Sequence, residues 1–371
     1  MWGMRVLAVD DSVLVRRELA RVLSRDPEIE QVDTAPNWRI ALAKIALRAP
    51  DLITLDVEMS QMNGLEVLSA LRKTHPLLPV IMFSAFTSPD ASATLNAGLT
   101  LAAVDYVRKP PRGAHEEATS KVIREDLLPK IKLHLSTKVA AQPSLSRIVP
   151  MRIPDASHAQ VVRVVSRVDI VVIGVSTGGP KALAELLPSF PRDFPVPILI
   201  VQHMPPEFTD LLAEELSSRS KLEVEEATSV HVLEPGHVWL AQGDSHMVVE
   251  KTAGIARIRL HKGPRENSCR PSVDVLFRSA VEVYGPGVLA ILMTGMGRDG
   301  FEGCKVVRET GGQILVQDEA SSVVWGMPGF VTQAGFVDEV LPLSELGPHI
   351  IERVMAFRAS ESSTNPKSIH R

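Results

Sequence analysis

The sequence predicts an α/β protein with two doubly wound units, each built on a mostly parallel sheet. Short, continuously apolar runs alternate with helical patterns along most of the 371 residues, and the alternation fails from about residue 136 to 167. Continuous apolar runs indicate strands buried on both faces, as in parallel sheets that helices cover on each side. A chain of this length also favours two domains over one.

The composition narrows the class of protein. Apolar residues make up 45% and charged residues 23%, as in ordinary globular proteins. The net charge of −4 argues against a nucleic-acid partner, because such binding relies on neutralising phosphates. Cys269 and Cys304 are the only cysteines, so we expect a reducing compartment and no disulfide framework. The start lacks a secretory signal and no apolar run approaches a membrane span of roughly 18 residues, so we expect a cytoplasmic protein without membrane insertion.

The first unit, expected over residues 4–125, alternates apolar runs with helical patterns. We expect strands within 4–11, 50–56, 78–85 and 102–110, and helices within 12–26, 37–49, 63–75 and 116–131. Residues 126–167 are expected to hold the end of the last helix and a mildly basic linker that mixes Pro, Ser and Ala.

The second unit, expected over residues 168–358, repeats the pattern with one interruption. We expect strands within 168–175, 196–203, 287–295 and 311–319, and helices within 180–190, 207–219, 272–284 and 349–359. Turn signals between alternating runs in 235–263 predict antiparallel hairpins. Residues 359–371 are expected to form a disordered tail.

Polar side chains follow the strands of the first unit. They are Asp10 and Asp11, then Asp56, Ser84 and Lys109. The carboxyl ends of parallel strands meet at one edge of a sheet, so these groups converge there. Carboxylates suit Mg²⁺, which neutralises a phosphoryl donor while a carboxylate attacks and an ammonium pairs with the product. Strand-end aspartates also occur as simple helix caps, but five matching positions argue against that alternative.

These residues and the stretches VDDS, LDVEM, FSA and DYVRKP resemble a two-component receiver domain over residues 4–125. The resemblance implies a flavodoxin-like (βα)5 fold and a Mg²⁺-dependent phosphorylation. It implies that Asp56 accepts the phosphoryl group and that Asp10 and Asp11 belong to the metal pocket.

The same resemblance implies supporting roles for three more residues. The backbone carbonyl of Glu58 completes the metal shell, Ser84 senses the phosphoryl group, and Tyr106 is the aromatic switch. Ser60 and Asn63 stand where the family usually has Pro and Asp, but neither change removes a metal ligand.

The stretch VVIGVSTGGPKAL, residues 171–183, places Ser176 between glycines at the end of a predicted strand. G-x-S-x-G is typical of a nucleophile elbow, but glycines in this setting also hold dinucleotide phosphates. A dinucleotide site asks for a carboxylate about 20 residues on, where the next strand instead ends in His203. The pattern therefore favours a serine nucleophile with a histidine base.

A base needs a third group to hold its tautomer, and Asp299, in LMTGMGRDG after another strand, is the candidate. The chain order Ser176, His203, Asp299 differs from the orders of common hydrolases, but geometry matters rather than order. Each residue alone more often has a structural role, Ser176 and Asp299 as turn residues and His203 as a hydrogen-bonded polar group. Their joint placement after three strands favours the triad.

Residues 168–355 resemble the catalytic domain of chemotaxis-type protein-glutamate methylesterases, through IGVSTGGP, VQHMPPEFT, EPGHVWLA, CRPSVDVLF, TGMGRDG and QDEASSVVWGMP. The resemblance implies the triad Ser176, His203 and Asp299. The backbone N–H groups of Met296 and Thr177 are the expected oxyanion-hole donors.

Two residues of CRPSVDVLF are open to more than one interpretation. Arg270 is expected either to contact an acidic receptor helix in the substrate groove or to help cap a helix. Cys269 has no evident paired histidine in the sequence, so we expect a structural role for it.

The resemblance implies a phosphorylation-activated serine esterase that hydrolyses glutamate γ-methyl esters on methyl-accepting chemoreceptors, and related enzymes also deamidate receptor glutamines. The implied partners are the receptors' cytoplasmic domains and a chemotaxis sensor histidine kinase as phosphodonor. The esterase reaction itself is expected to need no cofactor. A receiver-controlled binding module with a vestigial esterase fold, or the same chemistry on a non-chemotaxis receptor, are the alternatives.

Overall fold

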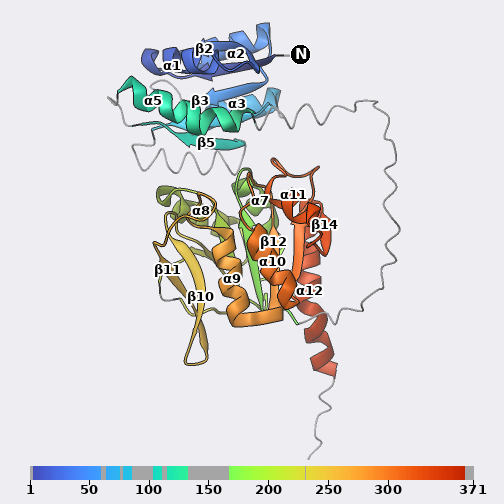
Figure 1. Cartoon of the computed structure of the whole chain (residues 1–371). Helices are drawn as coiled ribbons and strands as arrows, with labels where there is room; N and C mark the ends of the chain where they lie inside the picture. Colours follow the sequence, from blue (N-terminus) through green and yellow to red (C-terminus); the bar gives the residue numbers. More distant parts are fainter. Residues whose placement is uncertain are drawn as a thin grey trace, which may run out of the picture.

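The computed structural model describes residues 3–59, 64–75, 78–85, 103–110, 115–132, 167–229 and 231–363. They form two α/β domains, one on each side of the predicted linker (Figure 1). From residue 133 to 166 the linker lies outside the described residues. Among the described helices, none combines the length and apolar character needed to cross a bilayer.

The N-terminal domain has a parallel five-stranded sheet in the order β2-β1-β3-β4-β5. Its strands are β1 (Met4–Val9), β2 (Ile29–Ala35), β3 (Leu52–Leu55), β4 (Val80–Ser84) and β5 (Asp105–Arg108). Its described helices are α1 (Val13–Leu23), α2 (Trp38–Leu47), α3 (Gly64–Thr74) and α5 (Glu116–Val122), which continues into the π-helical turn η1 (Ile123–Leu127). The parallel sheet is confirmed.

Strand β2 is not among the four strand segments predicted for this domain. It lies at the edge of the sheet, and its sequence IEQVDTA is mostly half-buried instead of continuously apolar. An edge strand packs fewer side chains into the core, so its hydrophobic signal is weak.

The C-terminal domain has a parallel seven-stranded sheet in the order β14-β13-β12-β6-β7-β9-β8. The strands are β6 (Ile170–Val175), β7 (Ile198–Gln202), β8 (Glu223–Glu226), β9 (His237–Leu240), β12 (Val288–Leu292), β13 (Gln313–Gln317) and β14 (Glu339–Leu341). The three strands that the predicted catalytic residues follow, β12, β6 and β7, are neighbours in the sheet.

The segment 235–263 holds one antiparallel hairpin, β10 (His246–Thr252) and β11 (Ile255–His261). The expectation of more than one hairpin is wrong, because β9 joins the parallel sheet between β7 and β8.

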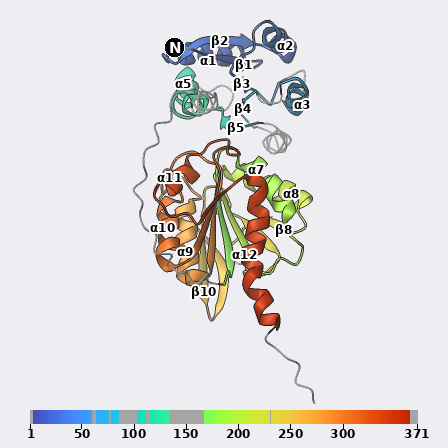
Figure 2. The ribbon, with the colours of Figure 1, turned by 90° about the vertical axis from the view of Figure 1, so that its right-hand side faces the viewer.

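Helices cover both faces of this sheet, with α7 (Gly179–Leu186), α8 (Pro206–Arg219) and α12 (Leu343–Ser363) on one side (Figure 2). The other side carries α9 (Val273–Tyr284), α10 (Phe301–Thr310) and α11 (Met327–Gln333). Helices α10 and α11 were not predicted. Helix α12 extends past residue 359, where the tail was expected to begin, and residues 364–371 lie outside the described residues.

Strand β5 of the N-terminal domain faces α7 and α8 of the C-terminal domain (Figures 1 and 2). The rings of Tyr106 and Phe208 meet edge-to-face across this boundary, with centroids 5.7 Å apart. Arg108 pairs with Glu207 beside them. The edge of the sheet that carries the elbow serine is thus the edge next to the N-terminal domain.

Candidate active site

Ser176 lies on a tight turn between β6 and α7, as a nucleophile elbow requires. Gly178 has φ +79°, and a Cβ there would lie 2.6 Å from the side chain of Val323. The Ser176 N–H donates to the carbonyl of Thr294, at 3.0 Å, and Gln202 Nε2 donates to the Ser176 carbonyl, also at 3.0 Å. The turn is therefore held by the two neighbouring strands.

His203 and Asp299 are joined directly. His203 Nε2 lies 2.8 Å from Asp299 Oδ2, although the two residues follow different strands. The sequence-based pairing of this histidine with this carboxylate is present in the structure, beside the loop that carries Ser176.

Asp299 is fixed by the start of α9. Its Oδ1 accepts hydrogen bonds from the Ser272 hydroxyl at 2.7 Å and from Asn267 Nδ2 at 3.0 Å. Its Oδ2 also accepts from the Val273 backbone N–H, at 2.7 Å, at the positive end of the helix. Burial alone raises the pKa of Asp299, but the hydrogen bond and charge of His203, with these donors, lower it to about 2. Asp299 is therefore ionised.

Ser176 and His203 are not hydrogen-bonded to each other in this structure, in which both residues are described. The second ring nitrogen of His203, Nδ1, instead faces Cys269 Sγ at 3.7 Å. The expectation that Cys269 has no paired histidine is wrong, because a loop 66 residues further along the chain brings it there. Burial lowers the pKa of His203, but hydrogen bonds to Asp299 and Cys269 outweigh it and raise the pKa to about 10.

The candidate oxyanion donors flank the elbow. Within residues 167–229 and 231–363, the backbone N–H groups of Thr177 and Met296 donate no hydrogen bond. Gly295, directly before Met296, lies against Ser176, since a Cβ on it would be 2.9 Å from the Ser176 Cβ. Both loops thus offer unused donors next to the serine.

A cavity of about 650 Å³ opens between the domains beside His203. Its wall includes Tyr106 and Lys130 from the N-terminal domain and Cys269 and Arg270 from the C-terminal domain. The Arg270 guanidinium lies 2.7 Å from Asp244 and also donates to the Gly263 carbonyl at 2.9 Å. Arg270 therefore lies at the predicted groove, but its guanidinium already forms an ion pair with the Asp244 carboxylate.

The N-terminal domain reaches the elbow itself. The Thr177 hydroxyl donates to Asp105 Oδ2 at 2.9 Å, and both side chains are buried. Lys130 Nζ lies 2.5 Å from the other Asp105 oxygen, Oδ1. The residue next to the candidate nucleophile is thus tied to β5.

The acidic pocket at the carboxyl edge of the N-terminal sheet is present. Lys109 Nζ lies 2.5 Å from Asp10 Oδ2 and 2.7 Å from Asp56 Oδ2. Carboxylate oxygens of Asp10, Asp11 and Asp56 lie within 4.8 Å of one another. Burial raises the pKa of Asp10 to about 6, with Lys109 opposing the rise and the charge of Asp56 adding to it.

The donor set of this pocket fits Mg²⁺ and a phosphoryl group. Hard carboxylate oxygens are the ligands that Mg²⁺ prefers. Ser84, at the end of β4, has a fully buried hydroxyl without a hydrogen-bond partner among the described residues. A phosphoryl oxygen would satisfy it. Glu58 lies two residues after Asp56 in the loop that follows β3, and its N–H donates to Asp56 Oδ1 at 3.1 Å.

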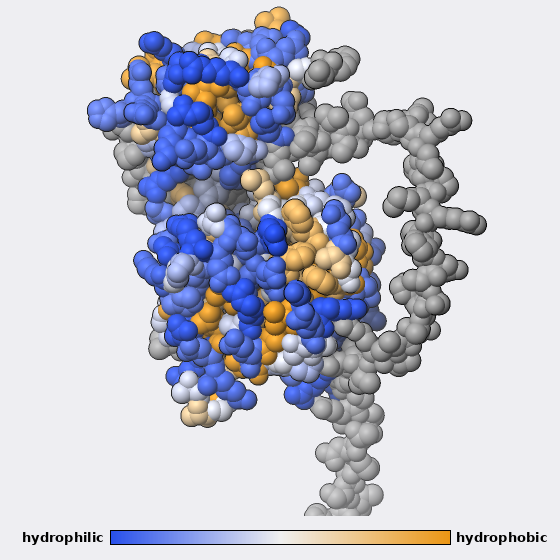
Figure 3. All heavy atoms as spheres, in the orientation of Figure 1, coloured by the Kyte–Doolittle hydropathy of each residue, from blue (hydrophilic) through white to orange (hydrophobic). Residues whose placement is uncertain are grey.

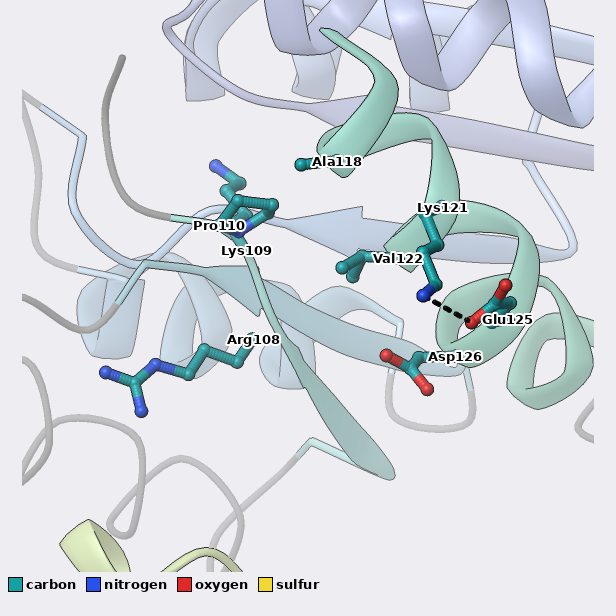
Figure 4. Close-up of a pocket in the computed structure, with 8 residues that line it drawn as sticks. All are labelled: Arg108, Lys109, Pro110, Ala118, Lys121, Val122, Glu125 and Asp126. Carbon is teal, nitrogen blue, oxygen red and sulfur yellow. Dashed lines mark ion pairs between the residues drawn. The ribbon is translucent and has the colours of Figure 1, made fainter. Parts of the chain in front are cut away.

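Lys109 and Tyr106 connect this pocket to the rest of the domain. Figure 4 shows the end of β5, where Lys109 and Pro110 border a groove of about 490 Å³ against α5. On the same strand, Tyr106 packs on Phe208, and Lys130 Nζ lies 5.3 Å from the centre of its ring. The predicted switch residue therefore lies at the boundary between the domains.

Comparisons with known proteins agree with this architecture. The sequence model of the family described as CheB methylesterase matches residues 171–350, and that of the response regulator receiver domain matches residues 6–118. A protein-glutamate methylesterase/protein-glutamine glutaminase of Trichodesmium erythraeum is 49% identical over 350 residues, which are 94% of this chain and 99% of the relative. The chain belongs to this family.

Other methylesterases give the same result. A relative of the same description from a Nocardioides species is 46% identical over 361 residues, covering 97% of this chain and 98% of its own length. The crystal structure of the Thermotoga maritima CheB methylesterase catalytic domain has 41% identity and a TM-score of 0.49, and it covers 50% of this chain and 99% of that domain. The two family models and the two relatives show that the chain combines a receiver domain with a methylesterase domain, as predicted.

Proposed function

We propose that this protein is a protein-glutamate methylesterase that removes γ-methyl esters from chemoreceptor glutamates and is activated by phosphorylation of its receiver domain. The observation that carries the catalytic half is the 2.8 Å bond between His203 and Asp299 beside the elbow of Ser176. Three strand-end loops supply a nucleophile, a base and the group that orients the base.

The reaction begins when His203 Nδ1 turns from Cys269 to the Ser176 hydroxyl. Ser176 Oγ attacks the ester carbonyl while Nδ1 takes its proton, and the N–H groups of Thr177 and Met296 receive the oxyanion. The tetrahedral intermediate collapses as His203 protonates the methoxy group, which leaves as methanol. A water molecule then attacks the acyl-enzyme, His203 accepts its proton and returns it to Ser176 Oγ, and glutamate is released.

The same acyl-enzyme chemistry accounts for a glutaminase activity. With a glutamine side chain, His203 protonates the amide nitrogen, ammonia leaves, and the glutamyl ester on Ser176 hydrolyses as before. The proton on His203 Nε2 stays on the ring throughout, hydrogen-bonded to the ionised Asp299. The proposed hydrolysis uses side chains and water, so it needs no cofactor.

The substrate is expected to approach a partly apolar surface near the elbow. Figure 3 shows a hydrophobic patch on the C-terminal domain near α11, on the side next to the receiver. Phe330 of α11 and Met296 beside the elbow are both more than 40% exposed. These side chains suit a receptor helix whose methyl-esterified glutamates have lost their charge.

Regulation is proposed to act through β5. Asp10, Asp11 and Asp56, with the Glu58 carbonyl, would hold Mg²⁺, and the ion would supply charge neutralisation for phosphoryl transfer to Asp56. Ser84 and Lys109 then contact the new phosphoryl oxygens. Movement of these groups at the end of β4 and β5 withdraws Tyr106 from Phe208, and the receiver releases the elbow.

The proposed partners follow from the functions of the two domains. The receiver takes its phosphoryl group from a chemotaxis sensor histidine kinase, and the esterase acts on the cytoplasmic domains of methyl-accepting chemoreceptors. We therefore place the protein in the cytoplasm.

Removal of residues 1–150 tests the regulatory half, because the triad lies in the remaining domain. Basal methanol release from a methylated receptor fragment should rise. An unchanged basal rate with intact catalysis would contradict inhibition by the receiver, and no release from either form would favour a binding module.

A further inference from the structure

We infer that Cys269 Sγ and His203 Nδ1 form a binding site for a thiophilic divalent cation such as Zn²⁺. The two atoms lie 3.7 Å apart. In a tetrahedral zinc site, bonds of about 2.3 Å to sulfur and about 2.05 Å to nitrogen place these atoms about 3.6 Å apart. The observed separation therefore lets one ion bridge both ligands with little rearrangement.

The orientation of the imidazole ring also suits a metal ligand. His203 uses Nε2 toward Asp299, so Nδ1, which binds a metal once it has lost its proton, is directed to Cys269. Metal-binding histidines commonly donate their other ring N–H to a carboxylate, which fixes the tautomer and increases the basicity of the ligand nitrogen. Asp299 supplies that carboxylate.

Asp299 acts as a support of the histidine in this site. Both of its oxygens already accept hydrogen bonds from the start of α9, from Ser272 and Val273, in addition to His203. The proposed site therefore takes two ligands from the protein, Cys269 and His203, and water from the cavity would supply the others, since both residues belong to the cavity wall.

The types of ligand atom determine which metal ion the site prefers. A thiolate with an imidazole favours Zn²⁺ over Mg²⁺, which prefers oxygen ligands. The proposed metal ligands in the acidic pocket of the receiver are all oxygen atoms, so that pocket favours Mg²⁺ and the Cys269–His203 pair favours Zn²⁺. Binding releases the thiol proton of Cys269 and the proton on His203 Nδ1 to solvent, and no oxidant or reductant is needed.

Inhibition of the esterase by a bound ion rests on the proposed function, whereas binding of the ion does not. Zn²⁺ on Nδ1 occupies the nitrogen that must accept the proton of Ser176. A bound ion therefore inhibits the esterase reversibly, and a chelator restores activity.

Binding is tested with Co²⁺ as a spectroscopic substitute for Zn²⁺, on the tag-free, full-length Ser176→Ala protein. We expect a thiolate-to-cobalt charge-transfer band that stoichiometric Zn²⁺ removes. The band should be lost when Cys269→Ser or His203→Gln is combined with Ser176→Ala. It should be kept when Cys304→Ser is combined with Ser176→Ala, since Cys304 is fully buried in the core. Absence of the band in the parent, or its persistence in Cys269→Ser, would overturn the site.

Inhibition is tested with the active chain and a methylated receptor fragment. The Zn²⁺ concentration for half-inhibition should rise at least tenfold in Cys269→Ser and stay unchanged in Cys304→Ser. Zinc that binds without inhibiting would overturn the proposed consequence. A cobalt band in a chain that releases no methanol would leave the site standing and contradict the proposed function.

Discussion

Asp105 on the last receiver strand accepts a buried hydrogen bond from the hydroxyl of Thr177, the residue directly after the proposed nucleophile. One contact thus joins the strand that precedes Lys109 to the backbone that carries an oxyanion donor. The proposed phosphorylation site, Asp56, and the proposed nucleophile, Ser176, are therefore connected through contacts of one short segment, β5, and of Lys109 directly after it.

Replacing Asp105 by Ala should raise the activity of the unphosphorylated protein. The change removes the acceptor of Thr177 and the partner of Lys130, and a buried hydrogen bond contributes about 1 kcal/mol, or about fivefold in the docking equilibrium. Methanol release without phosphodonor measures it, with the phosphorylated rate as reference.

Arg108→Ala is the matched control on the same strand. Its ion pair with Glu207 is largely exposed, and such pairs contribute about 0–1 kcal/mol. A larger rise in Arg108→Ala than in Asp105→Ala would show that the buried contact does not hold the domains together.

Asp299→Asn should lower kcat by about 10³- to 10⁴-fold. The amide keeps the shape of the carboxylate but no longer stabilises a charged His203 or fixes its tautomer. Asp274→Asn serves as control, because Asp274 contacts Asn267 and Gly303 and not His203. Comparable losses in both variants would assign the effect to folding around α9 and not to the triad.

The rate of the unphosphorylated protein should increase with pH through an acidic limb set by His203. Burial lowers the pKa of His203, but the contacts with Asp299 and Cys269 raise the pKa by more, to about 10. Only the neutral ring accepts a proton, so the rate rises as the ring loses its proton. Cys269→Ala removes one of the two raising contacts, so the limb should move to lower pH. An unmoved limb in the pH profile of kcat/KM, with Cys304→Ala as control, would exclude this influence of Cys269.

Chelation of Mg²⁺ and the Asp56→Asn change should each abolish stimulation by a small-molecule phosphodonor without lowering the basal rate. The acidic pocket lies in the receiver, apart from Ser176, so only the response depends on it. A basal rate that falls with Mg²⁺ removal would place a metal requirement in the esterase step.

The sheet core and the site could be predicted because they depend on local patterns. Strands β6, β7 and β12 are continuously buried, so their apolar runs stand out, and the catalytic candidates follow directly after them. Convergence of the strand ends then follows from the topology of a parallel sheet.

The remaining features depend on contacts between distant segments. Ser272 and Asn267 hold Asp299, and Cys269 faces His203, because the loop before α9 folds over the end of β12. The run CRPSVDVLF contains Cys269 and Ser272, but the sequence alone does not show which carboxylate or histidine these residues contact. Similarly, β8 is a short edge strand with the charged sequence EVEE, which lacks a strand signal.

Methanol release from a methylated chemoreceptor fragment tests the central claim most directly. It is measured with and without phosphodonor plus Mg²⁺, beside Ser176→Ala and Asp56→Asn. We predict release that requires Ser176 and that phosphodonor increases only when Asp56 is present. Release that persists in Ser176→Ala, or no release from the unmodified chain under any of these conditions, would contradict the account.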